Sequence, residues 1–127
     1  MSKSTIGERR DRDRATEAFR RWARAGCPPP DQIRVDKVGH EVAEDFRACS
    51  AVFAVLEKES RRGRENTAAA EIIRAVRAVY MEEPFRTLLR QEVSHRVQAV
   101  ATERYVSARE VYNWLARARR MWLMYRE

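Results

Sequence analysis

The spacing of apolar residues along the chain predicts helices. Between Glu8 and Ala25 the charged residues alternate in sign, and apolar residues recur every three or four positions, at Ala15, Ala18, Phe19, Trp22 and Ala23. This spacing places the apolar side chains on one face of a helix. A Pro-rich segment over residues 27–31 then interrupts the pattern, because proline cannot continue a helix. We therefore expect a first helix over about residues 8–25.

A second helix is predicted over about residues 40–60. Its apolar residues step alternately by four and three positions and form a heptad seam of Val42, Phe46, Cys49, Phe53 and Leu56. Such a seam either packs in the core of its own chain or contacts a second copy. Two heptads are too short to establish a coiled coil. We favour the core, and a homodimer through the helix from Val42 to Leu56 is the alternative.

A third helix is predicted to start near Thr67, a candidate N-cap, and to reach Tyr80. The two glutamates before Pro84 interrupt it. Proline suits the first turn of a helix and acidic residues are favourable there, so Pro84 is expected to begin a further helix. The pattern leaves open whether the chain bends near Ser94 or runs straight from Pro84 to Arg104.

The stretch from Val97 to Trp122 predicts two helices joined by a tight turn. Ser107 is expected to cap the second helix by accepting the backbone N–H of Glu110, whose carboxylate reaches back to the N–H of Ser107. The packing face of the first helix is Val97, Val100 and Ala101, and that of the second is Val111, Leu115, Ala118 and Trp122, with Trp114 beside it. The opposite face of the second helix carries Arg109, Tyr112, Asn113, Arg117 and Arg120.

Strand signals are nearly absent, so the expected fold is all-α, a small helical domain of about four to six helices ending in a C-terminal helix-turn-helix. We expect an N-terminal helical region over residues 1–66 and a helix-turn-helix domain over residues 67–127. The net charge is +7, and most of the basic residues are arginine. This charge attracts polyanions, and the guanidinium fork suits phosphate and guanine, although arginine content also follows genomic base composition.

Several classes of function are not expected from this composition. The two cysteines, Cys27 and Cys49, have no partners at metal-ligand spacing, and the two histidines, His40 and His95, lie far apart without a catalytic partner. No glycine spacing suits a phosphate cradle. We therefore expect no enzyme, cofactor or metal site. The chain has no signal peptide and no apolar run that would span a bilayer, so a cytoplasmic protein without membrane contact is expected.

The C-terminal pattern resembles the helix-turn-helix of the fourth region of bacterial sigma factors. Val100 and Ala101 match the Ile-Ala pair of that motif, Ser107 its capping residue, and Glu110 and Val111 its Thr-Val pair. Its later positions correspond to Leu115, Ala118, Arg119 and Trp122. Two residues depart from the pattern: Tyr105 stands where glycine is usual, and Arg104 where an apolar residue is usual. A small all-α chain that ends in such a motif also resembles phage and prophage late-gene regulators of the ArpU and RinA type, and the run from Val106 to Leu115 carries most of that likeness.

The resemblance implies a sequence-specific regulator that binds double-stranded DNA and places the helix from Ser107 to Met124 in the major groove. Arg109, Tyr112 and Asn113 would face base edges, while Arg117, Arg120 and Arg104 would contact phosphate. Contact with RNA polymerase is a further implication. Two alternatives stand beside it. One is the small DNA-recognition subunit of a phage terminase, and the other is a helix-mediated protein-interaction module.

Overall fold

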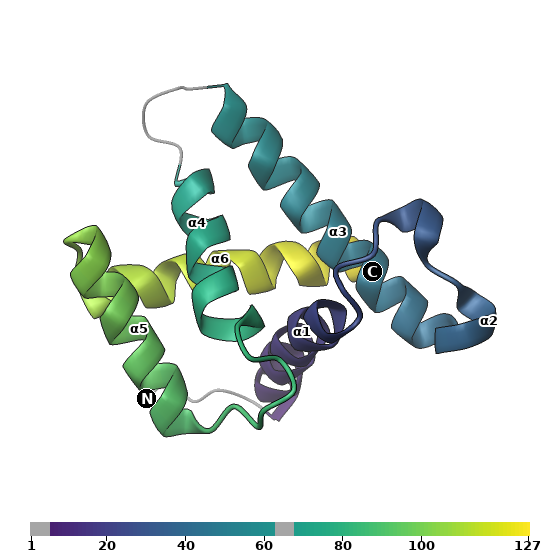
Figure 1. The fold of residues 1–127 in the computed structure, drawn as a ribbon, viewed down its shortest axis with the longest axis horizontal. Helices are drawn as coiled ribbons and strands as arrows, with labels where there is room; N and C mark the ends of the chain where they lie inside the picture. The colour runs from purple at the N-terminus through teal and green to yellow at the C-terminus, as the bar shows by residue number, and fades with distance from the viewer. Residues whose placement is uncertain (1–5, 63–67) are drawn as a thin grey trace.

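The computed structural model describes residues 6–62 and 68–127 and has an all-α fold (Figure 1). No strand occurs in either of these ranges. The α-helices within them are α1 (Ile6–Arg24), α2 (Val35–Val38), α3 (His40–Arg61), α4 (Ala69–Val76), α5 (Arg90–Arg104) and α6 (Ala108–Arg126). A 3-10 turn (Pro30–Gln32) precedes α2, and a π-helical turn (Arg77–Met81) extends α4. The predicted cap at Thr67 lies outside the described residues.

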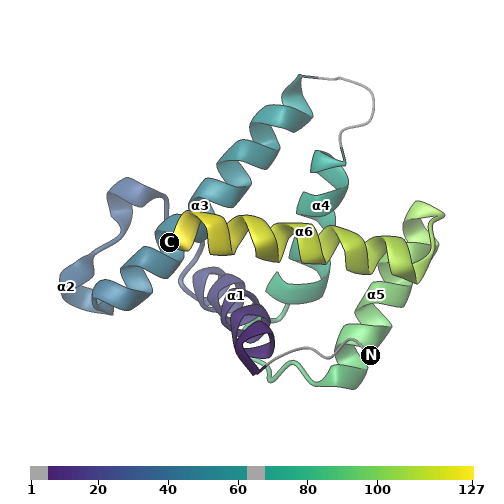
Figure 2. The ribbon, with the colours of Figure 1, turned by 180° about the vertical axis from the view of Figure 1, so that it is seen from behind.

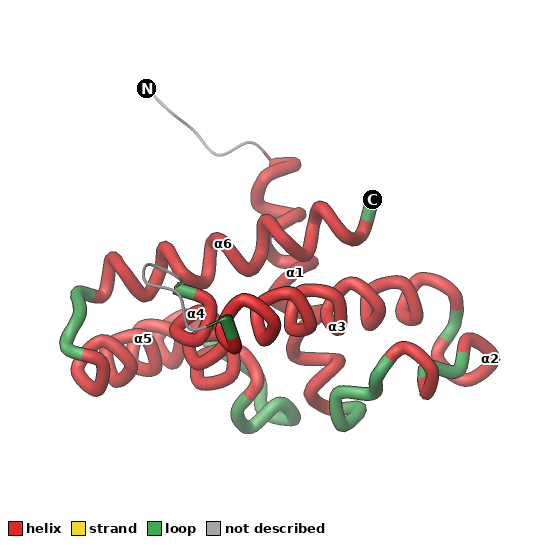
Figure 3. Tube along the Cα trace, turned by 90° about the horizontal axis from the view of Figure 1, so that it is seen from above, coloured by secondary structure: helices red, strands yellow, loops and turns green. Residues whose placement is uncertain are grey.

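Helix α6 packs against α1, α3, α4 and α5 and is the element that joins them. Figure 2 shows it crossing α3 and α4, and in Figure 3 it lies above α3, α4 and α5, while α1 runs past it. All five residues of its predicted packing face are buried, namely Val111, Trp114, Leu115, Ala118 and Trp122. The indole N–H of Trp122 also donates to the backbone carbonyl of Asp45 at 3.2 Å, which ties α6 to α3. One side of α6 is thus part of the core along most of its length.

The apolar face predicted for the first helix also packs in the core. In α1, Ala15, Ala18, Phe19 and Trp22 are buried. The Phe19 ring meets Phe53 of α3 edge-on, with 6.1 Å between ring centroids, and Trp22 packs against the same ring. The described part of α1 is thus held by aromatic contacts to α3.

The heptad seam of α3 belongs to the same core. Phe46, Cys49, Phe53 and Leu56 are buried, and Val42 is half-buried. The burial of these side chains within one copy of the chain agrees with the favoured core packing, and a homodimer through the helix from Val42 to Leu56 stays a prediction. Both cysteines are free thiols. The core is continuous across the two regions expected over residues 1–66 and 67–127, since α1 and α3 share it with α4, α5 and α6.

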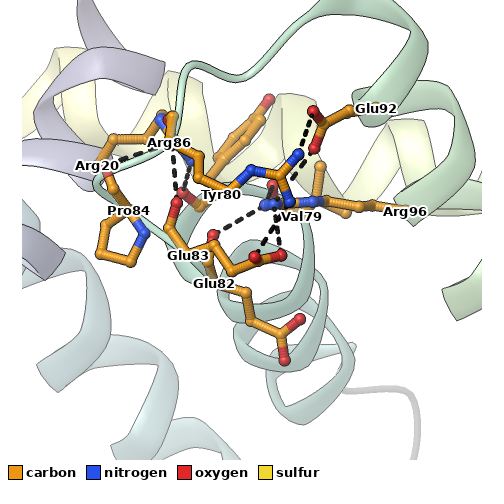
Figure 4. Close-up of polar contacts among 9 residues, drawn as sticks. All are labelled: Arg20, Val79, Tyr80, Glu82, Glu83, Pro84, Arg86, Glu92 and Arg96. Carbon is orange, nitrogen blue, oxygen red and sulfur yellow. Dashed lines mark hydrogen bonds and ion pairs between the residues drawn. The ribbon is translucent and has the colours of Figure 1, made fainter.

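The helix predicted to begin at Pro84 is not formed. Residues 82–89 are turns and irregular backbone, and α5 begins only at Arg90 and continues through Ser94 to Arg104. The reason is a long-range interaction. The buried Arg20 side chain donates to backbone carbonyls of this segment, and Glu83 adopts a positive φ of 48°, which a right-handed helix does not allow (Figure 4).

Candidate nucleic-acid interface

The predicted turn between the last two helices is present, and it is built without glycine. Tyr105 follows α5 in the left-handed conformation, with φ 56° and ψ 42°, at the position where glycine is usual. The N–H of Val106 donates to the carbonyl of Ala101 at 3.0 Å, which closes the end of α5. A left-handed L-residue costs roughly 1–2 kcal/mol relative to the right-handed form. The Tyr105 side chain is 95% exposed, so its own packing does not offset this cost.

Ser107 caps the N-terminus of α6 as predicted. Its Oγ accepts the backbone N–H of Glu110 at 3.1 Å, which satisfies one of the free donors of the first turn. Of the two hydrogen bonds predicted between Ser107 and Glu110, this is the one that the structure shows. The cap fixes where α6 begins, and it therefore fixes which residues lie on the first two turns.

The five residues predicted for the opposite face of α6 are all exposed. They are Arg109, Tyr112, Asn113, Arg117 and Arg120, and we call them the outer face of α6. Their exposure contrasts with the buried stripe on the other side of the same helix. Among the residues that the structure describes, no acidic side chain forms an ion pair with the three arginines of this face. Their charge is therefore available to an external anion.

Several arginines elsewhere in the described residues pair with acidic side chains. Ion pairs join Arg34 to Asp36, Arg47 to Glu44, Arg74 to Glu71 and Arg86 to Glu83 and Glu92. The outer face of α6 differs from these sites, because among the described residues its arginines have no acidic partner.

Arg104, predicted to contact phosphate, forms an ion pair within the chain. Its Nε lies 3.0 Å from Oε2 of Glu71, thirty-three residues earlier on α4. This ion pair holds α5 to α4 beside the turn. The structure therefore separates Arg104 from the unpaired arginines of α6, and a phosphate contact would have to share its guanidinium with Glu71.

Acidic residues gather at the opposite end of α6. Arg126, in the last turn, donates to Asp45 at 2.6 Å and also pairs with Glu41, both on α3. The hydrogen bond to Asp45 raises the pKa of the Arg126 guanidinium. These pairs fasten the C-terminal end of α6 to α3, and the three arginines of the outer face lie before that last turn.

Arg119 was not among the predicted site residues, yet it lies beside them. Its Nη1 donates to the hydroxyl of Tyr80 at 2.6 Å, and the side chain is half-buried at the flank of α6. Tyr112 lies on the same flank and, with Arg119, lines a groove between α1, α5 and α6. The helical register signals this placement, since Arg119 is four residues from the buried Leu115.

The described residues contain neither a cluster of metal-ligand side chains nor a helix that could span a membrane. Within residues 6–62 and 68–127, no three acidic, histidine or cysteine side chains come together as a metal site would require. None of the described helices combines the length and apolar character that crossing a membrane demands. Comparisons of the chain with protein-family models, with curated proteins and with solved structures found no match.

Proposed function

We propose that the protein is a sequence-specific DNA-binding regulator of the phage or prophage type that binds double-stranded DNA through the outer face of α6. The observation that carries the proposal is the composition of that face. Three unpaired arginines, one asparagine and one tyrosine are exposed on a helix whose other side is fixed in the core. A helix presented in this way fits the width of the major groove.

The residues have different roles in this proposal. Arg109 and Asn113 lie on the first two turns, where base edges are reached. Arginine can bond guanine and asparagine can bond adenine in a bidentate manner, each giving about 1–3 kcal/mol of discrimination. Arg117 and Arg120 lie further along the helix and contact phosphate, which supplies affinity and salt dependence. Tyr112 lies at the flank of α6 and contacts base edges at the side of the DNA major groove.

The regulatory role rests on the sigma-region-4-like pattern together with the turn and cap that join α5 and α6. Contact with RNA polymerase is part of the same proposal. A packaging role is the alternative, since the DNA-recognition subunit of a terminase also presents a helix of this kind. The two differ in assembly, because a packaging subunit forms a ring of many copies and a regulator acts as a monomer or dimer. Sedimentation of the purified full chain separates them.

The first experiment is a fluorescence-anisotropy titration of the full chain with a random-sequence duplex at two salt concentrations. Binding should weaken steeply as salt increases, because phosphate contacts release counterions. A variant with Arg109→Ala and Arg117→Ala should bind more weakly. Arg34→Ala is the matched control, since it removes the same charged group from an exposed site on another element. Absence of binding at low salt would refute the proposal.

A second experiment tests base recognition. Selection from a randomised duplex library should yield a preferred site for the wild-type chain. Asn113→Ala and Arg109→Ala should retain salt-dependent binding and lose most of that preference. If both variants keep the wild-type site preference, base reading by these residues is excluded while nonspecific DNA binding is still supported.

A further inference from the structure

The segment over residues 82–89 is irregular, but it is held by arginines from two helices. Arg20 of α1 is only 4% exposed. Its guanidinium donates to the carbonyl of Tyr80 at 2.7 Å, to those of Glu83 and Pro84 at 3.3 Å each, and to that of Arg86 (Figure 4). One side chain thus binds four carbonyls that no helix or sheet would otherwise satisfy. We call residues 82–89 the clamped loop.

Two more arginines complete the clamp. Arg24 donates to the carbonyl of Pro84 at 2.8 Å. Arg96 of α5 donates to the carbonyls of Val79 and Glu82 at 2.9 Å each, and Figure 4 shows it meeting the loop from the side opposite Arg20. The backbone of the clamped loop is therefore fixed from both sides, in contrast to an ordinary surface loop.

This fixed loop presents apolar side chains to solvent. Phe85 is 80% exposed and Leu89 is 55% exposed, and no described residue covers either one. Burying a phenylalanine or leucine side chain stabilises a protein or a complex by about 1.5–3 kcal/mol. Phe85 and Leu89 do not contribute this stabilisation to the fold, although three arginines hold the backbone of the clamped loop in place. An aromatic side chain on a rigid support is typical of residues that dominate protein–protein interfaces.

A groove of about 1290 Å³ opens beside Phe85, and we call it the docking groove. Its walls come from α1, the clamped loop, α5 and α6. Apolar side chains of Leu88, Val93 and Leu115 line it, and Arg12, Arg90 and Arg119 lie around it. The two acidic residues that line it are Asp13 and Glu17, and Glu17 is paired with Arg24. The groove thus combines an apolar lining with an excess of positive charge.

We propose that the docking groove, with Phe85 and Leu89 at its edge, binds an acidic amphipathic segment of a partner protein. Apolar side chains of that segment would cover Phe85 and the lining of the groove, while its carboxylates would pair with Arg90 and Arg12. DNA matches the charge, but in a duplex the bases are stacked on one another and the charged phosphates on its exterior do not favour contact with Phe85. The chemistry of the surface therefore favours a protein segment. Tyr112 is the residue of the outer face of α6 that also lines this groove.

The test uses the full chain as bait for a displayed library of random 16-residue peptides, followed by anisotropy with the selected peptides in labelled form. The expected peptides carry several carboxylates and apolar residues at helical spacing. The double variant Phe85→Ser with Leu89→Ser should weaken their binding roughly tenfold or more, and so should Arg90→Glu. These changes are at exposed positions, so melting temperatures should stay close to that of the wild type.

Val35→Ser is the matched control, because Val35 is also an exposed apolar residue but lies on α2. It should leave peptide affinity unchanged. The inference is overturned if no acidic amphipathic peptide is selected, or if the selected peptides bind the Phe85 and Leu89 variant as tightly as the wild type. It is also overturned if Phe85→Ser abolishes self-association seen by sedimentation, since the occupant is then a second copy.

DNA binding is measured on the same variants, so that the two proposals can fail separately. Phe85→Ser should leave duplex affinity within about twofold of the wild type. A loss as large as that produced by Arg109→Ala would assign this surface to DNA and exclude a protein partner. Failure of the wild type to bind duplex would refute the proposed function without affecting the peptide result.

Discussion

Arg20 and Tyr80 are sixty residues apart in the chain, and the guanidinium of the first donates to the carbonyl of the second at 2.7 Å. Tyr80 lies in the π-helical turn that ends the α4 segment, where carbonyls have lost their helical donors. The Tyr80 ring also stacks on Phe19, one residue before Arg20, with 6.5 Å between centroids. One contact region thus joins the N-terminal helix to the clamped loop and to the end of α4.

Replacement of Arg20 by methionine should lower the free energy of unfolding by about 3 kcal/mol. Methionine matches the length of the aliphatic stem but removes the donor of the Tyr80 and Arg86 carbonyls, and each costs about 1–3 kcal/mol when it stays buried. Arg20→Lys keeps the charge without the planar fork and should recover less than half of the loss. Urea denaturation measures all three proteins. A loss below about 1 kcal/mol for Arg20→Met would show that water replaces the guanidinium.

Replacement of Tyr105 by glycine should raise the free energy of unfolding by about 0.5–1 kcal/mol. Glycine adopts the left-handed conformation without strain, and the gain is reduced by its greater freedom in the unfolded chain. Tyr105→Ala is the control, because alanine retains the strain and should stay near the wild type. If alanine and glycine stabilise the protein equally, the tyrosine side chain and not the backbone causes the effect.

The buried thiol of Cys49 should make stability fall at alkaline pH. Burial raises the pKa of Cys49 well above its ordinary value. Above pH ~8.5 the unfolded chain therefore releases this proton while the folded chain retains it, and the unfolded state binds fewer protons. The contribution to the free energy of unfolding then decreases as pH rises, by at most about 1.4 kcal/mol per pH unit, until the folded thiol also ionises.

Urea denaturation under reducing conditions at pH 7.5 and 9.5 tests this dependence. Cys49→Ala should lose stability at both pH values because it leaves a cavity, but its stability should decline less between them. Cys27 is unchanged in both proteins, and its contribution cancels in the comparison. Equal declines in the wild type and the variant would contradict the prediction.

Removal of Arg117 and Arg120 should flatten the salt dependence of DNA binding. If each contacts one phosphate, the double alanine variant should reduce the slope of log K against log salt by roughly 2. Anisotropy titrations at four salt concentrations give this slope. Arg34→Ala should leave it unchanged. A double variant that keeps the full wild-type slope would place the phosphate contacts elsewhere on the surface.

The sequence predicts the helices whose apolar residues repeat locally. The ends of α1 and α3 lie within two residues of the predicted ends, and the buried stripe of α6 is confirmed residue by residue. These predictions succeed because helical periodicity depends on neighbours three and four positions away. The exposure of the outer face of α6 follows from the same register, whereas its role in DNA binding stays a prediction.

Long-range polar contacts are what the sequence does not reveal. Residues 82–89 carry the local signals of a helix start, yet Arg20 and Arg24 bind their carbonyls from sixty or more positions away. The pairing of Arg104 with Glu71, thirty-three positions earlier, is also long-range and occupies the Arg104 guanidinium. The sequence around an arginine does not show whether its guanidinium will bind backbone carbonyls, pair with an acidic side chain or have no partner in the chain.

The two faces of α6 are under different evolutionary constraints. A substitution on its inner stripe disturbs packing with four other helices, so change there is costly. A substitution on its outer face changes an exposed side chain and leaves the core intact. Under the proposed function, DNA recognition would diverge by exchange of a few arginine, asparagine and tyrosine side chains, and a library randomised at those positions would retain the same fold. Because the buried stripe holds α6 in the core, the exposed residues of the helix can change without loss of the fold.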